Sequence, residues 1–275
     1  MKRTNVFFAV SLLLALSSGV AHAQYLLRYK FVKGAKWVYQ THMMVQTGLP
    51  GEPPGQGMFT VHGDGDTTIS IVRILSNGDA RIYSTTPNFL LPGSTAPSAR
   101  NVKTTYFTMS PIGRMSAVKL PVSPKGSPFM VSAINPEALS TDSLLLPVRK
   151  VRQGDSWSLE EPNPIRNSPP WRITTRFTKL LGTRKNPVAV LTSLYDIPVS
   201  AKVNDPSGVG PGMTAKGKMI IHRTTFFSVR EGKMLKTVIS GTGKIHVGPY
   251  GNRKPARTPM DVIITMQVTM RLTKG

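Results

Sequence analysis

The strictest pattern in this sequence is an alternation of side chains between residues 261 and 272. Apolar residues occupy every second position, and mostly polar residues lie between them. Successive side chains of a strand point to opposite faces, so this period of two predicts a long strand with one buried face. Such a strand belongs in an antiparallel sheet that covers a core on one side. The apolar residues are Val262, Ile264, Met266, Val268, Met270 and Leu272.

Two short motifs recur at a spacing of 120 residues (33 to 153, and 104 to 224). Lys33–Tyr39 and Gln153–Leu159 each place a glycine turn three residues before a tryptophan that opens a strand, and Thr104–Phe107 recurs as Thr224–Phe227. Two matches in one register predict the internal duplication of a β-rich unit. We interpret the recurring residues as packing anchors; stacking of the tryptophans on sugar rings is the alternative. The anchors are Gly34, Trp37, Gly154 and Trp157.

Residues 1–23 have the features of a cleaved signal peptide. Lys2 and Arg3 precede an apolar stretch over 6–16, and Ala21-His22-Ala23 has the small-x-small form of a cleavage site. We therefore expect an exported protein, periplasmic or extracellular. No later segment has the length and apolarity of a membrane-spanning helix.

The rest of the chain divides into two β repeats, over residues 24–145 and 146–275. Near the junction Asn135, Pro136 and Glu137 are typical of a helix start, which predicts a short connecting helix over 135–143. The expected fold is all-β with minor α: a curved antiparallel sheet or half-barrel built from two related β-meander repeats that form one continuous domain.

A hairpin is predicted where Ile69–Leu75 and Ala80–Thr86 flank Asn77-Gly78, a pair typical of a type I′ turn. Just before it, the Gly and Asp residues of His62–Thr67 favour a turn. A weak calcium site on Asp64 and Asp66 is the alternative, although Leu75 stands where a calcium loop ends in Glu.

Signals of catalysis are weak throughout. The chain contains no cysteine, which excludes thiol catalysis and cysteine zinc sites, and its histidines lack metal-ligand spacing. Ser116 and Lys119 match a Ser-x-x-Lys pair but lie in a predicted strand without a downstream Lys-Thr-Gly. Gly241–Lys244 resembles the end of a phosphate loop, but Ile245 replaces the magnesium-binding Ser or Thr. We predict a protein that is not an enzyme and that needs no cofactor or metal.

The charge of the sequence is strongly positive. Lys and Arg number 35 against 13 Asp and Glu, a net charge of +22, which favours anionic partners such as wall polymers, acidic polysaccharide or lipid head groups. The basic residues are scattered rather than grouped in one block, and no feature indicates specific nucleic-acid binding. A solvated surface and a dedicated binding face both remain open.

Methionines lie on several of the predicted strands. Methionine is flexible and polarisable, so it fills cores and also lines pockets that accept varied apolar ligands. Core filling and a cavity for a lipid-like ligand are therefore the two interpretations. The residues are Met109, Met115, Met219, Met234, Met266 and Met270.

The two glycine–aromatic motifs, Lys33–Tyr39 and Gln153–Leu159, resemble those of a family of uncharacterised exported bacterial β-proteins that open each half with such a strand. Phe107 to Met115 and Phe227 to Met234 support the likeness. That family is distantly similar to the LolA-like lipoprotein carriers, whose curved antiparallel sheet encloses an apolar cavity. The resemblance implies a half-barrel and an apolar ligand, and it implies no catalytic residue.

These features predict a non-enzymatic, exported envelope or secreted protein. We expect a binding or structural β-sheet module that accepts an apolar, lipid-like ligand. The alternative is a binder of an anionic polymer or surface, such as a wall polymer or acidic polysaccharide, through its basic surface.

Overall fold

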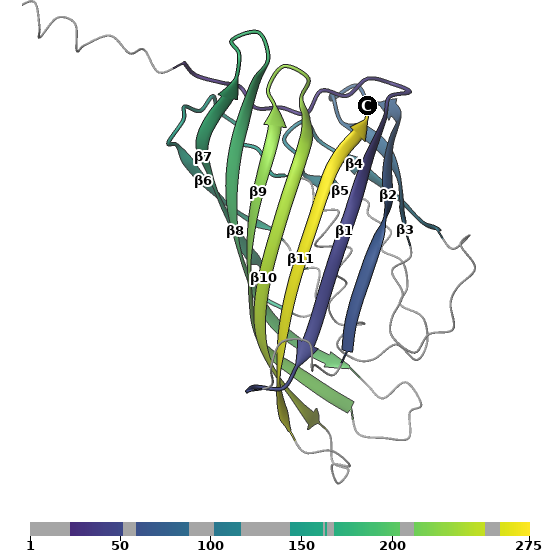
Figure 1. Ribbon diagram of the computed structural model, residues 1–275, viewed down its shortest axis with the longest axis vertical. Coiled ribbons are helices and arrows are strands. Elements are labelled where there is room, and N and C mark those ends of the chain that lie inside the picture. Colours follow the sequence, from purple (N-terminus) through teal and green to yellow (C-terminus); the bar gives the residue numbers. More distant parts are fainter. Residues whose placement is uncertain are drawn as a thin grey trace, which may run out of the picture.

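A computed structural model of the chain describes residues 23–51, 59–87, 102–116, 144–161, 163, 168–203, 212–250 and 259–275. These residues form a single curved antiparallel sheet of 11 strands (Figure 1). The strands are β1 (Lys36–Gly48), β2 (Phe59–Ile74), β3 (Ala80–Pro87), β4 (Val102–Met109), β5 (Met115–Ser116), β6 (Ser156–Glu161), β7 (Trp171–Gly182), β8 (Pro187–Val203), β9 (Gly212–Ser228), β10 (Lys233–Tyr250) and β11 (Met260–Lys274).

The order of strands across the sheet is β5-β4-β3-β2-β1-β11-β10-β9-β8-β7-β6. Each half of the chain forms a meander in which consecutive strands are neighbours. The last strand, β11, lies between β1 and β10 and joins the two meanders. The all-β, antiparallel prediction is therefore confirmed.

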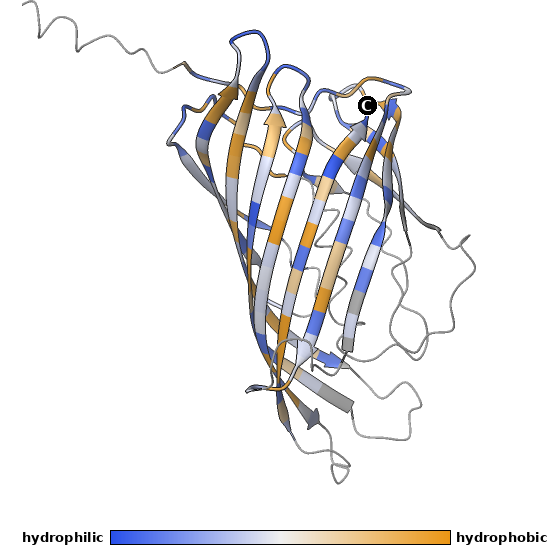
Figure 2. Ribbon diagram, in the orientation of Figure 1, coloured by the Kyte–Doolittle hydropathy of each residue, from blue (hydrophilic) through white to orange (hydrophobic). Residues whose placement is uncertain are grey.

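Side chains alternate across the sheet as the sequence predicted. On β11 the even-numbered apolar residues from Val262 to Met270 are buried, and the residues between them lie on the other face. Its neighbour β1 buries Trp37 and Tyr39 in the same way. Figure 2 shows the resulting alternation of hydrophobic and hydrophilic residues along these long strands. Burial of one face selects the register, because a shift of one residue would expose every apolar side chain.

One end of the sheet carries the four turns between strands that are described in full, and we call it the closed end. Two non-strand segments, 23–35 and 144–155, also pass across it (Figure 1). Tyr25 and Val151 exchange backbone hydrogen bonds of 2.8 and 2.9 Å, which ties the two segments together. The first segment also bonds to the turns after β4 and β9, through Tyr29 N to Pro111 O (2.8 Å) and Lys30 N to Gly232 O (3.0 Å).

The outermost strands of the sheet are connected through the second of these segments. Leu146 N donates to Ile112 O (2.8 Å) beside β5, and the Trp157 indole on β6 donates to Leu145 O (3.1 Å). An ion pair of 3.2 Å from Arg114 to Glu161 spans the same gap. The curved sheet is thus held together across its two edges.

The two glycine–tryptophan motifs make matching backbone contacts. Gly34 N donates to Ile71 O (2.9 Å), and Ile71 N donates to the carbonyl of the residue after that glycine. In the second motif Gly154 N donates to Phe177 O (2.7 Å), and Phe177 N donates to Asp155 O (2.9 Å). A register shift follows Ile71 in the β2–β3 pair and Phe177 in the β7–β8 pair. Both glycines have positive φ, +80° and +97°, which glycine adopts without a steric penalty.

The prediction of a turn over His62–Thr67 is wrong. These residues lie inside β2 and pair with β1 without interruption, Gly63 opposite Met43 and Gly65 opposite Thr41. The ladder with β1 continues along the whole segment and overrides the local preference of Gly and Asp for turns. Since Asp64 and Asp66 extend from a regular strand, they are not the start of a calcium loop.

The hairpin between β2 and β3 is present, but its turn differs from the predicted type I′. Leu75 N donates to Asp79 O (2.8 Å) and Gly78 N donates to Leu75 O (3.0 Å), which leaves a three-residue loop. Gly78 closes this loop with φ of +85°, as in a turn followed by a bulge. The Asn77 side chain accepts from Asp79 N (3.1 Å) and supports the wider loop.

The predicted connecting helix over 135–143 lies outside the described residues. In the part of the chain that the structure describes there is no helix with the length and apolarity to cross a membrane.

Candidate functional site

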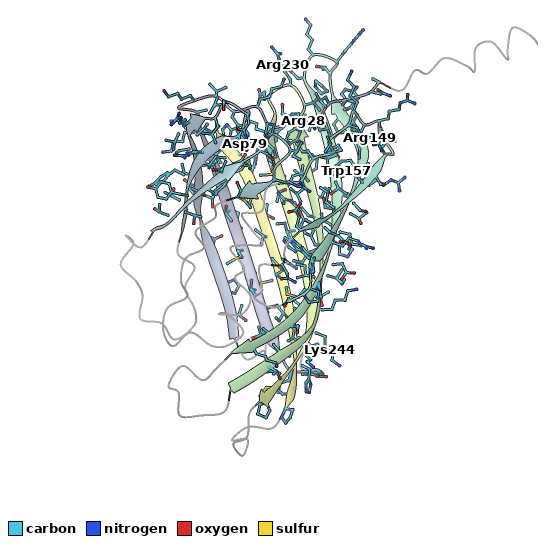
Figure 3. All side chains as sticks on the ribbon, turned by 180° about the vertical axis from the view of Figure 1, so that it is seen from behind. Arg28, Asp79, Arg149, Trp157, Arg230 and Lys244 are labelled. Atoms are coloured by element: carbon cyan, nitrogen blue, oxygen red, sulfur yellow. The ribbon has the colours of Figure 1, made fainter. Side chains whose placement is uncertain are left out.

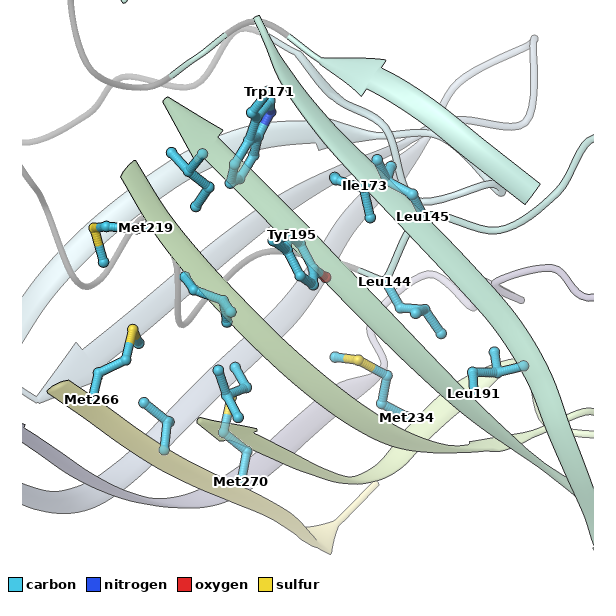
Figure 4. Packing of buried hydrophobic residues seen from close by; sticks show 14 of the residues in the cluster. Leu144, Leu145, Trp171, Ile173, Leu191, Tyr195, Met219, Met234, Met266 and Met270 are labelled. Atoms are coloured by element: carbon cyan, nitrogen blue, oxygen red, sulfur yellow. The ribbon is translucent and has the colours of Figure 1, made fainter. Parts of the chain in front are cut away.

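The inner face of the sheet, which carries the buried side chains of every long strand, is the candidate site. Most of its side chains are apolar, and Figure 4 shows a part of it around Tyr195 and Leu191. At the closed end Leu27, Tyr29 and Leu144 pack onto this face from the two crossing segments. The inner face is therefore the hydrophobic core at one end, and it continues along the strands away from that end.

A band of buried hydroxyl groups crosses this apolar face at about the same level on neighbouring strands. Hydroxyls that face each other across strand pairs hydrogen bond, which removes the cost of burying them. The pairs are Thr175 with Ser193 (2.9 Å), Thr225 with Thr237 (2.6 Å) and Thr41 with Thr67 (3.2 Å).

Arg223 lies in this band with only 2% of its surface exposed. Its Nε donates to the hydroxyls of Thr225 (3.1 Å) and Thr237 (3.3 Å). Its Nη1 donates to Tyr195 Oη (3.2 Å), and Nη2 lies 3.1 Å from Met234 Sδ. A buried cation is costly unless it is hydrogen bonded, so these contacts fix β8, β9 and β10 in one arrangement.

Two buried tyrosines lie near this guanidinium. Burial raises the pKa of both Tyr29 and Tyr39 far above the ordinary value, and the positive charge of Arg223 opposes that rise in each. Tyr39 Oη donates to Met234 O (3.1 Å), and Tyr29 Oη accepts from Leu144 N (3.0 Å). Both phenols therefore remain protonated and act as structural hydrogen-bonding groups.

Trp171, at the start of β7, has a buried polar atom that needs an explanation. The side chain is 6% exposed, and its ring centre lies 5.8 Å from that of Tyr195. Among the described residues its indole N–H finds no hydrogen-bond acceptor. Buried donors are nearly always satisfied in folded proteins, so this N–H is a candidate contact for a bound molecule.

The six predicted methionines all lie on strands that contribute to the inner face. Five are buried and Met115 is partly buried against the same cluster. They do not form one patch: Met109 and Met115 pair near the β5 edge, whereas Met266 and Met270 lie on the central β11. Figure 4 shows Met219, Met234, Met266 and Met270 spread along the face.

Two of the methionines lie over glycines of the neighbouring strand β10. A Cβ atom added at Gly243 would lie 2.6 Å from Met219 Cγ, and one added at Gly241 would lie 3.0 Å from Met266 Cγ. The methionine side chains thus occupy the space that a side chain on β10 would fill. At these two positions methionine fills the core.

The four predicted anchors occupy matching places. Gly34 and Gly154 form the turns before β1 and β6. Trp37 is 5% exposed and stacks near Phe31 with ring centres 6.3 Å apart, which leaves no open face for a sugar ring. Trp157 is partly buried, and its indole N–H donates a hydrogen bond to the Leu145 carbonyl.

The histidines of the described residues all lie on the outer face, exposed to solvent and away from the buried hydroxyl band. His42 contacts Asp64 across β1 and β2, and His246 lies 3.0 Å from Asp261 across β10 and β11. Lys244, and to a smaller degree His246, hold the pKa of the Asp261 carboxyl below its usual range. In the described ranges no three His, Cys, Asp or Glu side chains converge as a metal ion requires.

The segment that resembled a phosphate loop, Gly241–Lys244, runs through the middle of β10. Its backbone amides are committed to pairing with β9 and β11, so they cannot wrap a phosphate. Of the Ser116–Lys119 pair, only Ser116 belongs to the described residues, and it lies on β5.

Sequence reasoning missed Arg223 and Trp171. Arg223 carries a detectable signal, because it occupies an inward position between Ile221 and Thr225 in the alternation of β9. An arginine on the apolar face of a strand is unusual and points to a buried polar cluster. Trp171 has no such signal, since the sequence does not reveal which buried donors lack an acceptor.

A scan against protein-family models and a search of curated proteins give no match to this chain.

Proposed function

We propose that the protein is a non-enzymatic binding module whose inner face accepts an apolar ligand carrying a hydrogen-bond acceptor, such as an acylated lipid. The observation that carries this proposal is the buried indole N–H of Trp171, which has no acceptor among the described residues and lies on a mostly apolar face. Sites for such ligands are mostly apolar and contain a few polar groups that fix orientation. An ester or carboxyl oxygen of a lipid is the acceptor that this N–H lacks.

The distribution of polar groups supports binding rather than catalysis. The described histidines lie on the outer face, and histidine is the usual general acid or base at neutral pH. The six hydroxyls of the buried band hydrogen bond in pairs across strands, and two of them also accept from Arg223. We therefore assign this band to holding the sheet and the ligand surface in place.

Native mass spectrometry of gently purified protein tests the proposal. We expect a population with an added mass of one lipid, which organic extraction removes. A stripped sample should then bind a dansylated fatty acid with a rise in dansyl fluorescence. An apolar site would be contradicted if the purified protein carried no added mass and the stripped protein did not raise the fluorescence of the dansyl probe.

Two tryptophan variants separate the ligand contact from a structural role. Trp171→Phe keeps the apolar ring and removes the N–H, so we expect about tenfold weaker binding of the acyl probe, the worth of one hydrogen bond. Its free energy of unfolding should change little, since the loss of a buried donor without a partner offsets the cost of the smaller ring. Trp157→Phe is the matched control: it loses the bond to Leu145 and about 1 kcal/mol of stability but keeps probe affinity. Equal affinity in both variants would refute the assignment of Trp171.

We also propose that the sheet derives from the duplication of a five-strand unit, with β1–β5 equivalent to β6–β10. The matching contacts of Gly34 and Gly154, and the register shifts that follow Ile71 and Phe177, support this interpretation. In this arrangement β11 is the additional strand that joins the two units.

We also propose that the protein is exported through the signal-like residues 1–23. This proposal rests on the sequence alone.

A further inference from the structure

Basic side chains gather on the outside of the closed end. Lys33, Lys150, Arg184 and Arg230 are exposed there on separate segments and turns. Figure 3 shows Arg28, Arg149 and Arg230 near this end of the molecule, whereas Lys244 lies toward the other end. Among the described residues, part of the positive charge that looks scattered in the sequence therefore gathers at one end.

Hydrogen bonds connect these segments into one surface. The Arg28 guanidinium donates to the carbonyls of Pro147 and Val148, which joins the two crossing segments. Lys30 Nζ donates to the carbonyl of Arg230 (2.8 Å), and the Arg230 side chain donates to Asn186 Oδ1 (3.0 Å) in the turn after β7. The cations are thus held on one continuous surface.

Most described carboxylates of this end form ion pairs, whereas Asp79, in the turn after β2, accepts a hydrogen bond from the Asn77 amide (3.0 Å). Asp155 pairs with Arg149 (3.4 Å) and accepts from a backbone amide, and Glu231 pairs with Lys233 (3.1 Å). Within the described residues no carboxylate forms an ion pair with Lys33, Lys150 or Arg184. The surface therefore keeps a net positive charge at close range.

Aliphatic side chains are exposed among these cations. Val148 and Val32 are the most exposed large hydrophobic residues of the described chain, at 74% and 64%, and Leu26 is 49% exposed. Val148 directly precedes Arg149, and Val32 directly precedes Lys33. Exposed aliphatic residues surrounded by charged ones mark an interaction site rather than a core.

We propose that the closed end docks on the surface of a bilayer that contains anionic lipids. Each Lys or Arg near such a surface contributes attraction, and aliphatic side chains insert at the boundary between head groups and acyl chains. A polysaccharide or nucleic acid offers no apolar phase for Val32 and Val148, and it is recognised by stacking on exposed aromatic rings. In the first crossing segment Phe31 instead stacks on Tyr29 and Trp37, and Tyr25 packs edge-on against Phe177. The proposal does not depend on a ligand at the inner face.

Vesicle co-sedimentation of the full chain tests the proposal. We expect the protein to sediment with phosphatidylcholine vesicles that contain about one third phosphatidylglycerol, and to remain in solution with phosphatidylcholine alone. Raising the ionic strength should reduce binding, because salt screens the attraction. Failure to sediment with the anionic vesicles at low salt would overturn the proposal.

Three sets of variants locate the surface. The first is the triple variant Lys33→Gln, Lys150→Gln and Arg184→Gln. Each cation removed should weaken binding by about tenfold or less, so the triple variant should bind about a hundredfold more weakly. Val32→Ser with Val148→Ser keeps every charge and should weaken binding several-fold. The control Lys216→Gln, Lys218→Gln and Lys244→Gln removes the same formal charge from β9 and β10 near the other end. It should bind like the unmodified chain.

Two results would overturn the assignment. Binding that falls as much in the control triple variant as in the closed-end triple variant would show a response to net charge alone. Full binding by the valine variant, together with complete competition by soluble heparin, would identify a polyanion surface instead. Urea unfolding of each variant establishes that the sheet is intact.

Discussion

Tyr29 and Tyr39 are residues whose protonation is controlled by the fold. Both phenols are buried, and burial disfavours the charged form, so their pKa values lie far above the ordinary value despite the nearby Arg223. An unfolded tyrosine releases its proton near pH 10. Above that pH the unfolded chain therefore binds fewer protons than the folded chain, and stability falls as pH rises.

We predict that the free energy of unfolding is constant with respect to these groups below pH 10 and declines above it. Each buried tyrosine should contribute a slope of about 1.4 kcal/mol per pH unit. Urea unfolding between pH 9 and about 11.5 measures this slope. Either Tyr29→Phe or Tyr39→Phe should reduce the slope of unfolding free energy against pH by the contribution of one tyrosine, about 1.4 kcal/mol per pH unit.

Tyr106→Phe supplies the control, because the Tyr106 side chain is 59% exposed on the outer face of β4. This variant should leave the slope above pH 10 unchanged. A slope that is insensitive to both buried substitutions would show that water reaches the phenols in the folded state.

At the scale of elements, glycines with positive φ occupy the turns of the closed end, and four of them differ in the space around them. Gly34 and Gly154 have open space where a Cβ would be. A Cβ at Gly113 would lie 2.3 Å from Leu144 O, and one at Gly232 would lie 2.5 Å from Lys30 N. The second pair therefore serves two purposes, a left-handed backbone and close packing of the crossing segments.

We predict that substitution by alanine separates these two purposes. Gly34→Ala and Gly154→Ala should each cost about 1–2 kcal/mol, the strain of a left-handed residue with a Cβ. Gly113→Ala and Gly232→Ala should cost at least about 2 kcal/mol more, since backbone atoms must also move apart. Chemical denaturation of the four variants compares them directly. Equal costs in all four would mean that the crossing segments do not pack on these turns.

Sequence reasoning works best for elements whose local and tertiary preferences agree. The alternation that predicted β11 is strict because that strand lies in the middle of the sheet with one face on the core. It fails for His62–Thr67, where Gly and Asp favour a turn but pairing with β1 holds a strand. The turn of Leu75–Asp79 is similar: the glycine was located, but the hydrogen-bond pattern depends on where the strands end.

The candidate site was predictable in outline only. The apolar lining follows from alternation, which is why the methionine positions fall on inner-face strands. The polar features depend on partners that are distant in sequence. Arg223 meets Tyr195 from β8 and Thr237 from β10, and no local pattern states that these strands are neighbours.

At the scale of the whole molecule, stability should be graded across the sheet. The strands β1, β10 and β11 are hydrogen bonded on both sides, whereas β5 and β6 are outermost and short. Local opening is least costly where few bonds and little apolar area are lost.

We predict that the amides of β1 and β11 exchange last and together in hydrogen–deuterium exchange with mass spectrometry. Amides of β6 should exchange earlier, and those of the β7–β8 turn first. Because Arg114 and Glu161 connect the two edges, Glu161→Gln should accelerate exchange in β6 and leave β11 unchanged. If β6 and β11 exchanged at one rate, the sheet would open only as a single unit.

The central position of β11 has a consequence for the biosynthesis of the protein. Among the described strands it is synthesised last, yet in the described sheet it supplies the pairing that joins β1 to β10. Until β11 has emerged, each of the two meanders therefore has a bare central edge. Bare edges recruit other strands, so the nascent chain is at greatest risk of mispairing just before its last strand emerges. A chaperone that shields extended segments would be needed most in that interval.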